Sequence, residues 1–200
     1  MGGRRTIWSR GAELLRRGGA RLVWFRILGE LGYRRQLVTE QLLPVEAVAP
    51  TPGLEGRFLG ADDLDAFGGL HGNADEARGR FARGERCFGV WLEGRLVSTR
   101  WLATGTIRLG YLGREVDLPP EQVYIYEIYT ERGHRGRGIS GAAGALVPPI
   151  LSAEGVRRIV GVLEPENRAG IRANEKAGYR IVGRIGYVKL GPWRRDFGRL

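Results

Sequence analysis

The stretch VYIYEIYTERGHRGRGIS, residues 123–140, carries a strand and a glycine-rich loop in direct succession. Residues 123–130 are almost all β-branched or aromatic, which favours a β-strand. The polar residues after them are rich in glycine, as connecting loops are. Small and apolar residues over 138–153 then predict a helix, which Pro148 and Pro149 should kink or interrupt.

The loop over residues 131–140 has the composition of an anion-binding site. Free backbone N–H groups at a helix N-terminus bind anions, and glycines let the chain approach such a ligand closely. Arg135 and Arg137 add positive charge. We therefore expect a phosphate-bearing ligand at this loop. The alternative interpretation is a tight turn between strand and helix whose arginines only face water.

Residues 136–141, GRGISG, also match the G-x-G-x-x-G pattern of dinucleotide-binding folds, with Glu164 in the place of the acidic ribose ligand. Two observations count against this interpretation. The insert ERGHR separates the strand from the first glycine, and too few residues follow Glu164 to complete a doubly wound sheet. RNA binding is also disfavoured, because the RGRG sequence occurs once and lies between regular elements. We expect no nucleic-acid partner.

The loop sequence RGRGIS, residues 135–140, resembles the acyl-CoA-binding loop of the GNAT superfamily of N-acyltransferases. The pattern of that loop is [RQ]-x-x-G-x-[GA]. Arg135 matches its first position and Gly138 its fourth, while Ser140 stands where Gly or Ala is usual. Serine is small enough for the loop to survive.

A second block, ENRAGIRANEKAGYR over residues 166–180, resembles another segment of the same family. The pattern of that segment is N-x-x-x-(I/A)-x-x-(Y)-x-k-x-G-F, and Tyr179 replaces its final Phe. The matching residues are Asn167, Ile171, Lys176 and Gly178. Two motifs in order are more specific than either alone. The resemblance covers roughly residues 55–190 and is strongest over 123–180.

The resemblance implies acetyl-CoA, or another acyl-CoA, as co-substrate, and no metal. The diphosphate would bind the loop backbone. Pantetheine would pair like an added strand with the predicted strand, where that strand splays from its neighbour. The residues implied to bind the cofactor are Ile128, Tyr129, Thr130, Arg135, Gly136, Arg137, Gly138, Ile139, Ser140 and Asn167.

Catalysis by such a site needs a group that takes a proton from the acceptor amine, and Glu127 is the candidate base. A charged residue inside an apolar strand is explained if it faces a cleft; the alternative is a structural ion pair with an arginine. A strand N–H near Ile128 or Tyr129 would polarise the thioester carbonyl. The family often has a Tyr that protonates the leaving thiolate, and Asn174 stands in its place. The sequence does not place a substitute hydroxyl.

From the whole chain we expect an α/β protein of the α+β type, with a mixed, mostly antiparallel central sheet flanked by helices. Residues 49–200 would form the GNAT-like acyltransferase domain. Residues 1–48 would form a basic, amphipathic helical extension with an extra strand over Gln36–Leu43. We favour helices that pack on their own domain. The alternative is a docking surface for a membrane or protein partner over residues 1–35.

Composition places the chain among ordinary globular proteins. Its 200 residues are 42% hydrophobic and 27% charged, which excludes collagen-like, mucin-like and wholly disordered classes. A single cysteine, Cys87, excludes an internal disulfide and a cysteine-rich zinc site, and two histidines leave little for a metal site. No apolar run is long enough to cross a bilayer. We expect a reduced, cytoplasmic protein.

The function we expect is transfer of an acyl group from acyl-CoA to a primary amine by direct attack in a ternary complex. A net charge of +10 favours an acidic or phosphate-bearing acceptor, although nearly all the basic residues are arginine, as coding bias can produce. Family likeness suggests a homodimer through the terminal strands. The alternative function is a catalytically silent CoA-binding interaction module that docks through its basic N-terminal helices.

Overall fold

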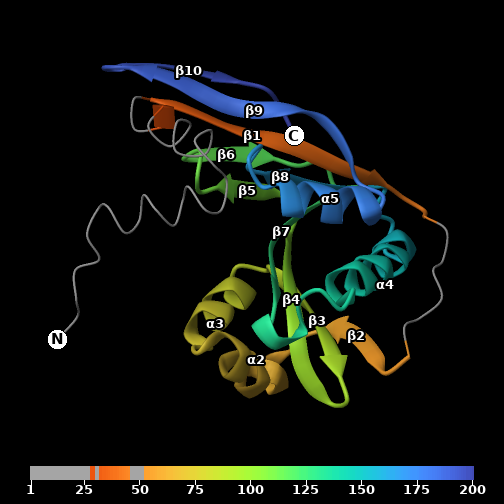
Figure 1. Ribbon diagram of the computed structural model, residues 1–200. Helices are drawn as coiled ribbons and strands as arrows, with labels where there is room; N and C mark the ends of the chain where they lie inside the picture. Colours follow the sequence, from red (N-terminus) through yellow and green to blue (C-terminus); the bar gives the residue numbers. More distant parts are fainter. Residues whose placement is uncertain (1–27, 30–31, 46–51) are drawn as a thin grey trace.

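The computed structural model describes residues 28–29, 32–45 and 52–200 (Figure 1). The strands are β1 (Tyr33–Leu42), β2 (Leu54–Phe58), β3 (Arg86–Leu92), β4 (Arg95–Ala103), β5 (Thr106–Leu109), β6 (Arg114–Asp117), β7 (Gln122–Thr130), β8 (Arg158–Leu163), β9 (Arg180–Leu190) and β10 (Trp193–Phe197). The helices are α2 (Leu64–His71), α3 (Asp75–Ala82), α4 (Ile139–Ala153) and α5 (Arg168–Lys176), with short 3-10 turns η1 (Ala61–Asp63) and η2 (Arg132–His134).

One large sheet runs through the molecule in the order β10-β9-β1-β8-β7-β4-β3-β2, and β5 pairs with β6 in a separate hairpin. Neighbouring strands of the large sheet are antiparallel, except that β7 and β8 are parallel. Helices flank this sheet, so the predicted mixed, mostly antiparallel architecture is confirmed (Figure 1).

The strand expected near residues 36–43 is present as β1, and it lies in the interior of the large sheet. β1 pairs with β8 on one side and with β9 on the other, antiparallel to both. A strand from early in the chain, β1, therefore lies between the two later strands β8 and β9 and pairs with both. The amphipathic helices predicted for the first 32 residues lie almost entirely outside the described residues.

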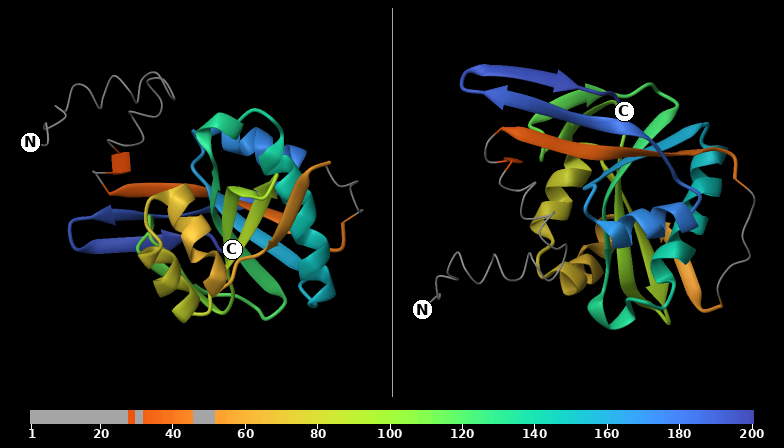
Figure 2. Two further views of the ribbon diagram at one scale, coloured as in Figure 1. Left: turned by 90° about the horizontal axis from the view of Figure 1, so that it is seen from below. Right: turned by 45° about the horizontal axis from the view of Figure 1, so that its top comes forward.

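Apolar side chains pack against both faces of the sheet. On one face, α4 covers the sheet with Ile139, Ala143, Val147 and Leu151, which cluster with Phe88 and Ile159. On the other face, Phe67 and Ala77 of α2 and α3 cluster with Cys87 and Trp101, and the β5–β6 hairpin covers β1, β8 and β9. Figure 2 shows the helices on opposite sides of the strands. Cys87 is a buried core residue of β3.

Pro148 and Pro149 do not interrupt α4, so the interruption that the sequence allowed does not occur. The helix runs from Ile139 to Ala153 with both prolines inside. Proline removes a backbone hydrogen bond and costs helix stability. Burial of the apolar face of α4 against the sheet offsets that cost, since Val147, Pro148 and Leu151 are all buried.

Asp63 gives the fold a pH-dependent contribution to its stability. Its carboxylate accepts hydrogen bonds at 2.6 Å from both terminal nitrogens of Arg57 and one at 2.9 Å from the backbone N–H of Gly60. The Arg57 guanidinium holds the pKa of Asp63 below its ordinary value of 3.8. A depressed pKa stabilises the fold above the unfolded-state pKa, and the contribution disappears as the pH falls through the folded-state pKa.

We expect Asp63→Asn to lower the free energy of unfolding at pH 7 by about 1–2 kcal/mol, because it removes the charge from these hydrogen bonds. Urea titrations at pH 7 and pH 3 measure this. The difference from the wild type should shrink at pH 3, because this pH lies below the ordinary pKa of 3.8 that the carboxyl has in the unfolded chain. Asp62→Asn is the matched control, since Asp62 is exposed. Equal effects of both variants at pH 7 would contradict the prediction.

Candidate functional site

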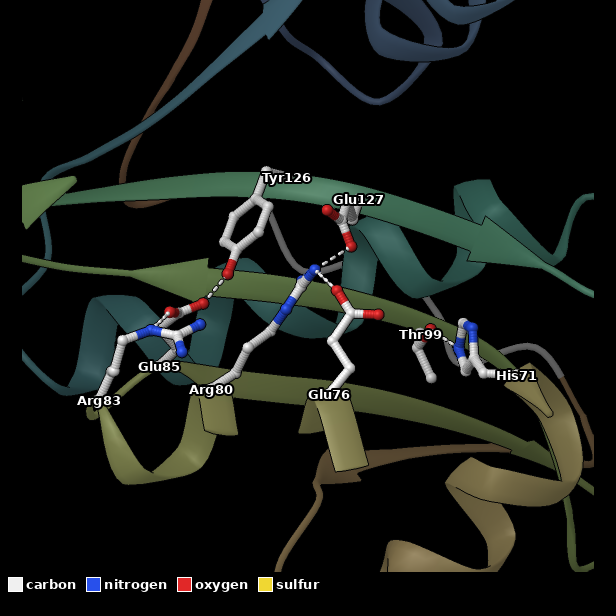
Figure 3. Close-up of polar contacts among 8 residues, drawn as sticks. All are labelled: His71, Glu76, Arg80, Arg83, Glu85, Thr99, Tyr126 and Glu127. Carbon is white, nitrogen blue, oxygen red and sulfur yellow. Dashed lines mark hydrogen bonds and ion pairs between the residues drawn. The ribbon is translucent and has the colours of Figure 1, made fainter. Parts of the chain in front are cut away.

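Strand β7 carries a β-bulge at Glu127. Glu127 has a left-handed backbone with φ of 44°. The register with β4 shifts between Thr99 and Trp101, which leaves Glu127 and Ile128 without a paired residue on that strand. Successive side chains of a regular strand point to opposite faces. Here the bulge turns the consecutive side chains of Tyr126 and Glu127 to the same side, toward α3 (Figure 3).

The pairing between β7 and β8 ends just before this bulge. Their parallel pairing covers only Gln122–Tyr124 against Arg158–Val160, although β7 continues to Thr130. Beyond Tyr124 the edge of β7 that faces β8 has no residue of β8 paired with it. This separation is the splay that the resemblance implied, and it leaves the second half of β7 able to pair with an extended ligand.

The glycine loop ends directly at the N-terminus of α4. Gly136 and Gly138 both have left-handed backbones, with φ of 78° and 79°, and Gly138 is the N-cap residue. A Cβ added at either glycine would meet no atom within 4 Å, so the loop faces open space. No side chain caps α4, so its first N–H groups remain free for a ligand. These features fit the backbone cradle that an anion requires.

Arg135 folds back from this loop onto the end of β7. Its Nε donates a hydrogen bond of 2.9 Å to the carbonyl oxygen of Thr130, and its guanidinium lies 5.7 Å from the centre of the Tyr129 ring. On the other side of the strand end, the Ser98 hydroxyl donates to the carbonyl oxygen of Tyr129 at 2.6 Å. The structure therefore brings Arg135 of the loop next to Tyr129 and Thr130 at the end of β7.

Arg80 of α3 holds the carboxylate of Glu127. One terminal nitrogen of this buried arginine lies 2.6 Å from Oε2 of Glu127 and also pairs with Glu76, one turn earlier on the helix (Figure 3). The guanidinium stacks over Trp101 and Tyr126, at 4.8 Å and 5.3 Å from the ring centres. The ion pair with an arginine is thus present. The Glu127 side chain is nevertheless 59% exposed, so the pair leaves it accessible.

A cavity of about 800 Å³ opens next to this cluster, between the end of α3, β4, β7 and the β5–β6 hairpin. In its wall, the Tyr126 hydroxyl donates a hydrogen bond to Glu85, and Nε of Arg83 donates to the same carboxylate at 2.8 Å (Figure 3). The Tyr124 ring stacks on Tyr126 at 5.3 Å. The cavity is therefore partly aromatic and presents charges of both signs.

Sequence reasoning missed Arg80, Arg83 and Glu85. All three lie in or after a short polar helix whose composition is that of an ordinary exposed surface. Only the tertiary contacts bring them under the bulge. His71 is similar: its Nε2 lies 2.9 Å from the Thr99 hydroxyl, and its ring packs between Phe67 and Tyr129. Burial lowers the pKa of His71, which favours the neutral ring.

The second block of the resemblance lies on α5. Asn167 is the N-cap of this helix, and its Oδ1 accepts a hydrogen bond of 2.9 Å from the backbone N–H of Gly170. Asn174 donates from Nδ2 to the Thr39 hydroxyl at 3.4 Å. Tyr179 packs against the apolar cluster under α4, and burial raises its pKa to about 12. Within the described residues, Asn167 therefore has a structural role of its own.

In the part of the chain that the structure describes, no group of three or more His, Cys, Asp or Glu side chains could hold a metal ion. None of the helices there is long and apolar enough to cross a membrane.

Solved structures resemble the overall fold of this chain. A GCN5-related N-acetyltransferase of Sphaerobacter thermophilus matches 84% of this chain and 55% of its own, at 20% identity and a TM-score of 0.52. An acetyltransferase of the GNAT family from Colwellia psychrerythraea matches 92% and 73%, at 15% identity and a TM-score of 0.53. This chain has the GNAT fold.

A third similar structure with that fold is a GCN5-related N-acetyltransferase of Kribbella flavida, with 80% of this chain and 60% of that chain matched at 15% identity and a TM-score of 0.51. This chain thus spans little more than half the length of the Sphaerobacter and Kribbella proteins. No protein-family model and no curated protein matches the sequence. At identities of 15–20%, these similarities establish the fold alone.

Proposed function

We propose that this protein transfers an acyl group from acyl-CoA to a primary amine. One observation carries the proposal: β7 separates from β8 and bulges at Glu127, beside an uncapped helix whose first residues follow an open glycine loop. Acyl-CoA carries both an extended thioester arm and a diphosphate. It therefore needs a free edge of strand backbone for the arm and an anion cradle for the diphosphate.

The acyl-CoA would lie across the splayed strands. Its diphosphate would bind the backbone of residues 135–140, and its pantetheine would pair with Ile128–Thr130. The open space at Gly136 and Gly138 supports the first placement, and the unpaired edge of β7 supports the second. Asn167 would reach the cofactor through Nδ2, because its Oδ1 already caps α5.

Direct attack by the amine is the step that the residues support. The amine nitrogen forms a bond to the thioester carbon, the C–S bond breaks, and Glu127 takes the proton that the amine loses. The N–H of Ile128 or Tyr129 would stabilise the charge that develops on the carbonyl oxygen. A covalent cysteine intermediate is disfavoured, because Cys87 is fully buried and burial raises its pKa to about 12. The thiolate would leave unprotonated or take a proton from water.

The acceptor amine would enter through the cavity beside α3. Glu85 lies in the wall of this cavity, 17% exposed, and would bind the ammonium group, while the stacked tyrosines would contact the rest of the molecule. Arg83 and the exposed Arg108 would favour an acceptor that also carries an anionic group.

We expect Glu85→Gln to raise the KM for the amine about ten-fold, with kcat changed by less than about three-fold, because it removes an attraction present before and during the reaction. Steady-state kinetics at saturating acetyl-CoA measure both constants. Glu115→Gln, at the opposite wall of the same cavity, is the comparison. A large loss of kcat with an unchanged KM would instead assign Glu85 a role in proton transfer.

The test of the proposed function is acetyl transfer itself. The protein is incubated with acetyl-CoA and a panel of amines with and without a carboxylate or phosphate group. Thiol release and the mass of the amine product are then followed. Formation of an acetylated amine that depends on Glu127 supports the proposal. Tight acetyl-CoA binding without transfer to any amine supports the alternative, a silent interaction module.

The remaining partners are proposals that rest on the sequence and the family likeness. A homodimer would form through the terminal strands β9 and β10, and residues 1–35 would contact a membrane surface or a protein. The exposed Leu190 and Trp193 at the turn between those two strands support the first of these. Cytoplasmic location remains an expectation from the cysteine content.

A further inference from the structure

Arg100 is a buried cation at the base of the glycine loop. It lies on β4 opposite the bulge, between the paired residues Thr99 and Trp101, and is only 3% exposed. One terminal nitrogen donates a hydrogen bond of 3.1 Å to the carbonyl oxygen of Ser140, in the first turn of α4. A Cβ built on Gly144 would lie 3.8 Å from the other terminal nitrogen. The guanidinium therefore lies against the first two turns of this helix.

No carboxylate in the described part of the chain balances this charge, and Nε of Arg100 has no hydrogen-bond partner there. The titratable groups that act on it are Tyr179 and Cys87, each with a pKa raised to about 12 and so neutral at pH 7. Burial lowers the pKa of Arg100 to about 10, which still leaves it charged at neutral pH. A buried charge without a counter-ion destabilises a fold.

The surroundings of Arg100 add positive rather than negative potential. α4 has no side-chain cap, so the positive end of its dipole is uncompensated. In the loop, Arg135 and Arg137 are cationic, while the one acid, Glu131, already pairs with Arg95 and lies 2.9 Å from His134. An anion bound at the loop would be the missing counter-charge.

We infer that Arg100 is part of the anion-binding site: its buried charge, transmitted through the first turn of α4, binds the diphosphate of acyl-CoA at the loop. The inference rests on the proposed function. It explains why the chain keeps an uncompensated charge in its core: the ligand, and not another residue, supplies the compensation. Arg100 also supports the loop directly, because its hydrogen bond holds Ser140.

The experiment compares Arg100→Met with the wild type in two measurements. Calorimetry with acetyl-CoA gives the affinity, and thermal unfolding without ligand gives the stability. We expect the affinity to fall about ten-fold, because a counter-charge is lost. The unfolding temperature without ligand should stay equal or rise, because an uncompensated buried charge is replaced by an apolar side chain of similar length. Arg195→Met, an exposed change of the same charge on β10, should leave both quantities unchanged.

The opposite movement of affinity and stability separates ligand binding from a structural role. Arg100→Met with unchanged affinity would overturn the inference, and so would an equal loss of affinity in Arg100→Lys, which keeps the positive charge at this position. If Arg100→Met does not fold, Arg100→Gln decides alone: weaker binding by a folded variant supports the inference, and equal binding overturns it. A wild-type protein that binds no acetyl-CoA would instead refute the proposed function.

Discussion

Gly138→Trp should reduce acetyl-CoA affinity by more than about 100-fold, measured by calorimetry. Gly138 has a φ of 79°, a conformation that costs energy for any side chain, and it is the N-cap residue of α4. The space around it is open, so an indole there would fill the volume in front of the free N–H groups. The proposed diphosphate position would be blocked by the side chain itself, with no need for the fold to change.

The matched control is Gly155→Trp, at the other end of the same helix. Gly155 also has a left-handed backbone, with φ of 90°, and also meets no atom within 4 Å of an added Cβ. Both variants therefore carry the same backbone strain and the same added surface. We expect equal losses of stability and loss of acetyl-CoA binding only for Gly138→Trp. Equal affinities in the two variants would exclude the loop as the diphosphate site.

Glu127→Gln should lower kcat by about 10²–10⁴-fold and leave the acetyl-CoA affinity unchanged, because it removes the base and keeps the shape of the side chain. The amide cannot accept the proton of an attacking amine. The bulge should persist, since its left-handed residue is kept in size and position. Single-turnover measurement of acetyl transfer, with binding measured separately, distinguishes loss of chemistry from loss of binding.

Glu76→Gln is the control for this variant, because Glu76 pairs with the same terminal nitrogen of Arg80. It removes one charge from the same arginine without touching the bulge. We expect its kcat to stay within about three-fold of the wild type. If both variants lost activity equally, Glu127 would be acting through the ion-pair cluster, and the structural interpretation of its pairing with Arg80 would replace the catalytic one.

Much of the fold was predictable because its decisive elements are local. The run of β-branched and aromatic residues predicts the strand β7, and the glycines after it predict the loop before α4. Gly178 marks the end of α5. Each of these signals lies within a few consecutive residues. α4 shows the limit of such local signals. Its two prolines argue against a continuous helix, and only the burial of its apolar face against the sheet overrides them.

The site was predictable only in part. Positions 135–140 could be proposed from the sequence because an anion cradle is made by consecutive backbone groups, so its signature is contiguous in the sequence. In the sequence, the only sign of the bulge at Glu127 is an acidic residue within an apolar strand. Regular alternation along that strand would put Tyr126 and Glu127 on opposite faces. The partners of these residues, Arg80 and Glu85, come from another element, and no spacing rule connects them to β7.

The amino-acid sequence alone therefore settled elements whose signals are local: the strand β7, the glycine loop after it and the helix α5. Tertiary structure alone decided what depends on contacts between distant segments. It placed β1 between β8 and β9, held Glu127 against Arg80, and buried Arg100 beneath the loop. The physical reason is that burial and charge pairing depend on which surfaces meet, and that is a property of the packed chain.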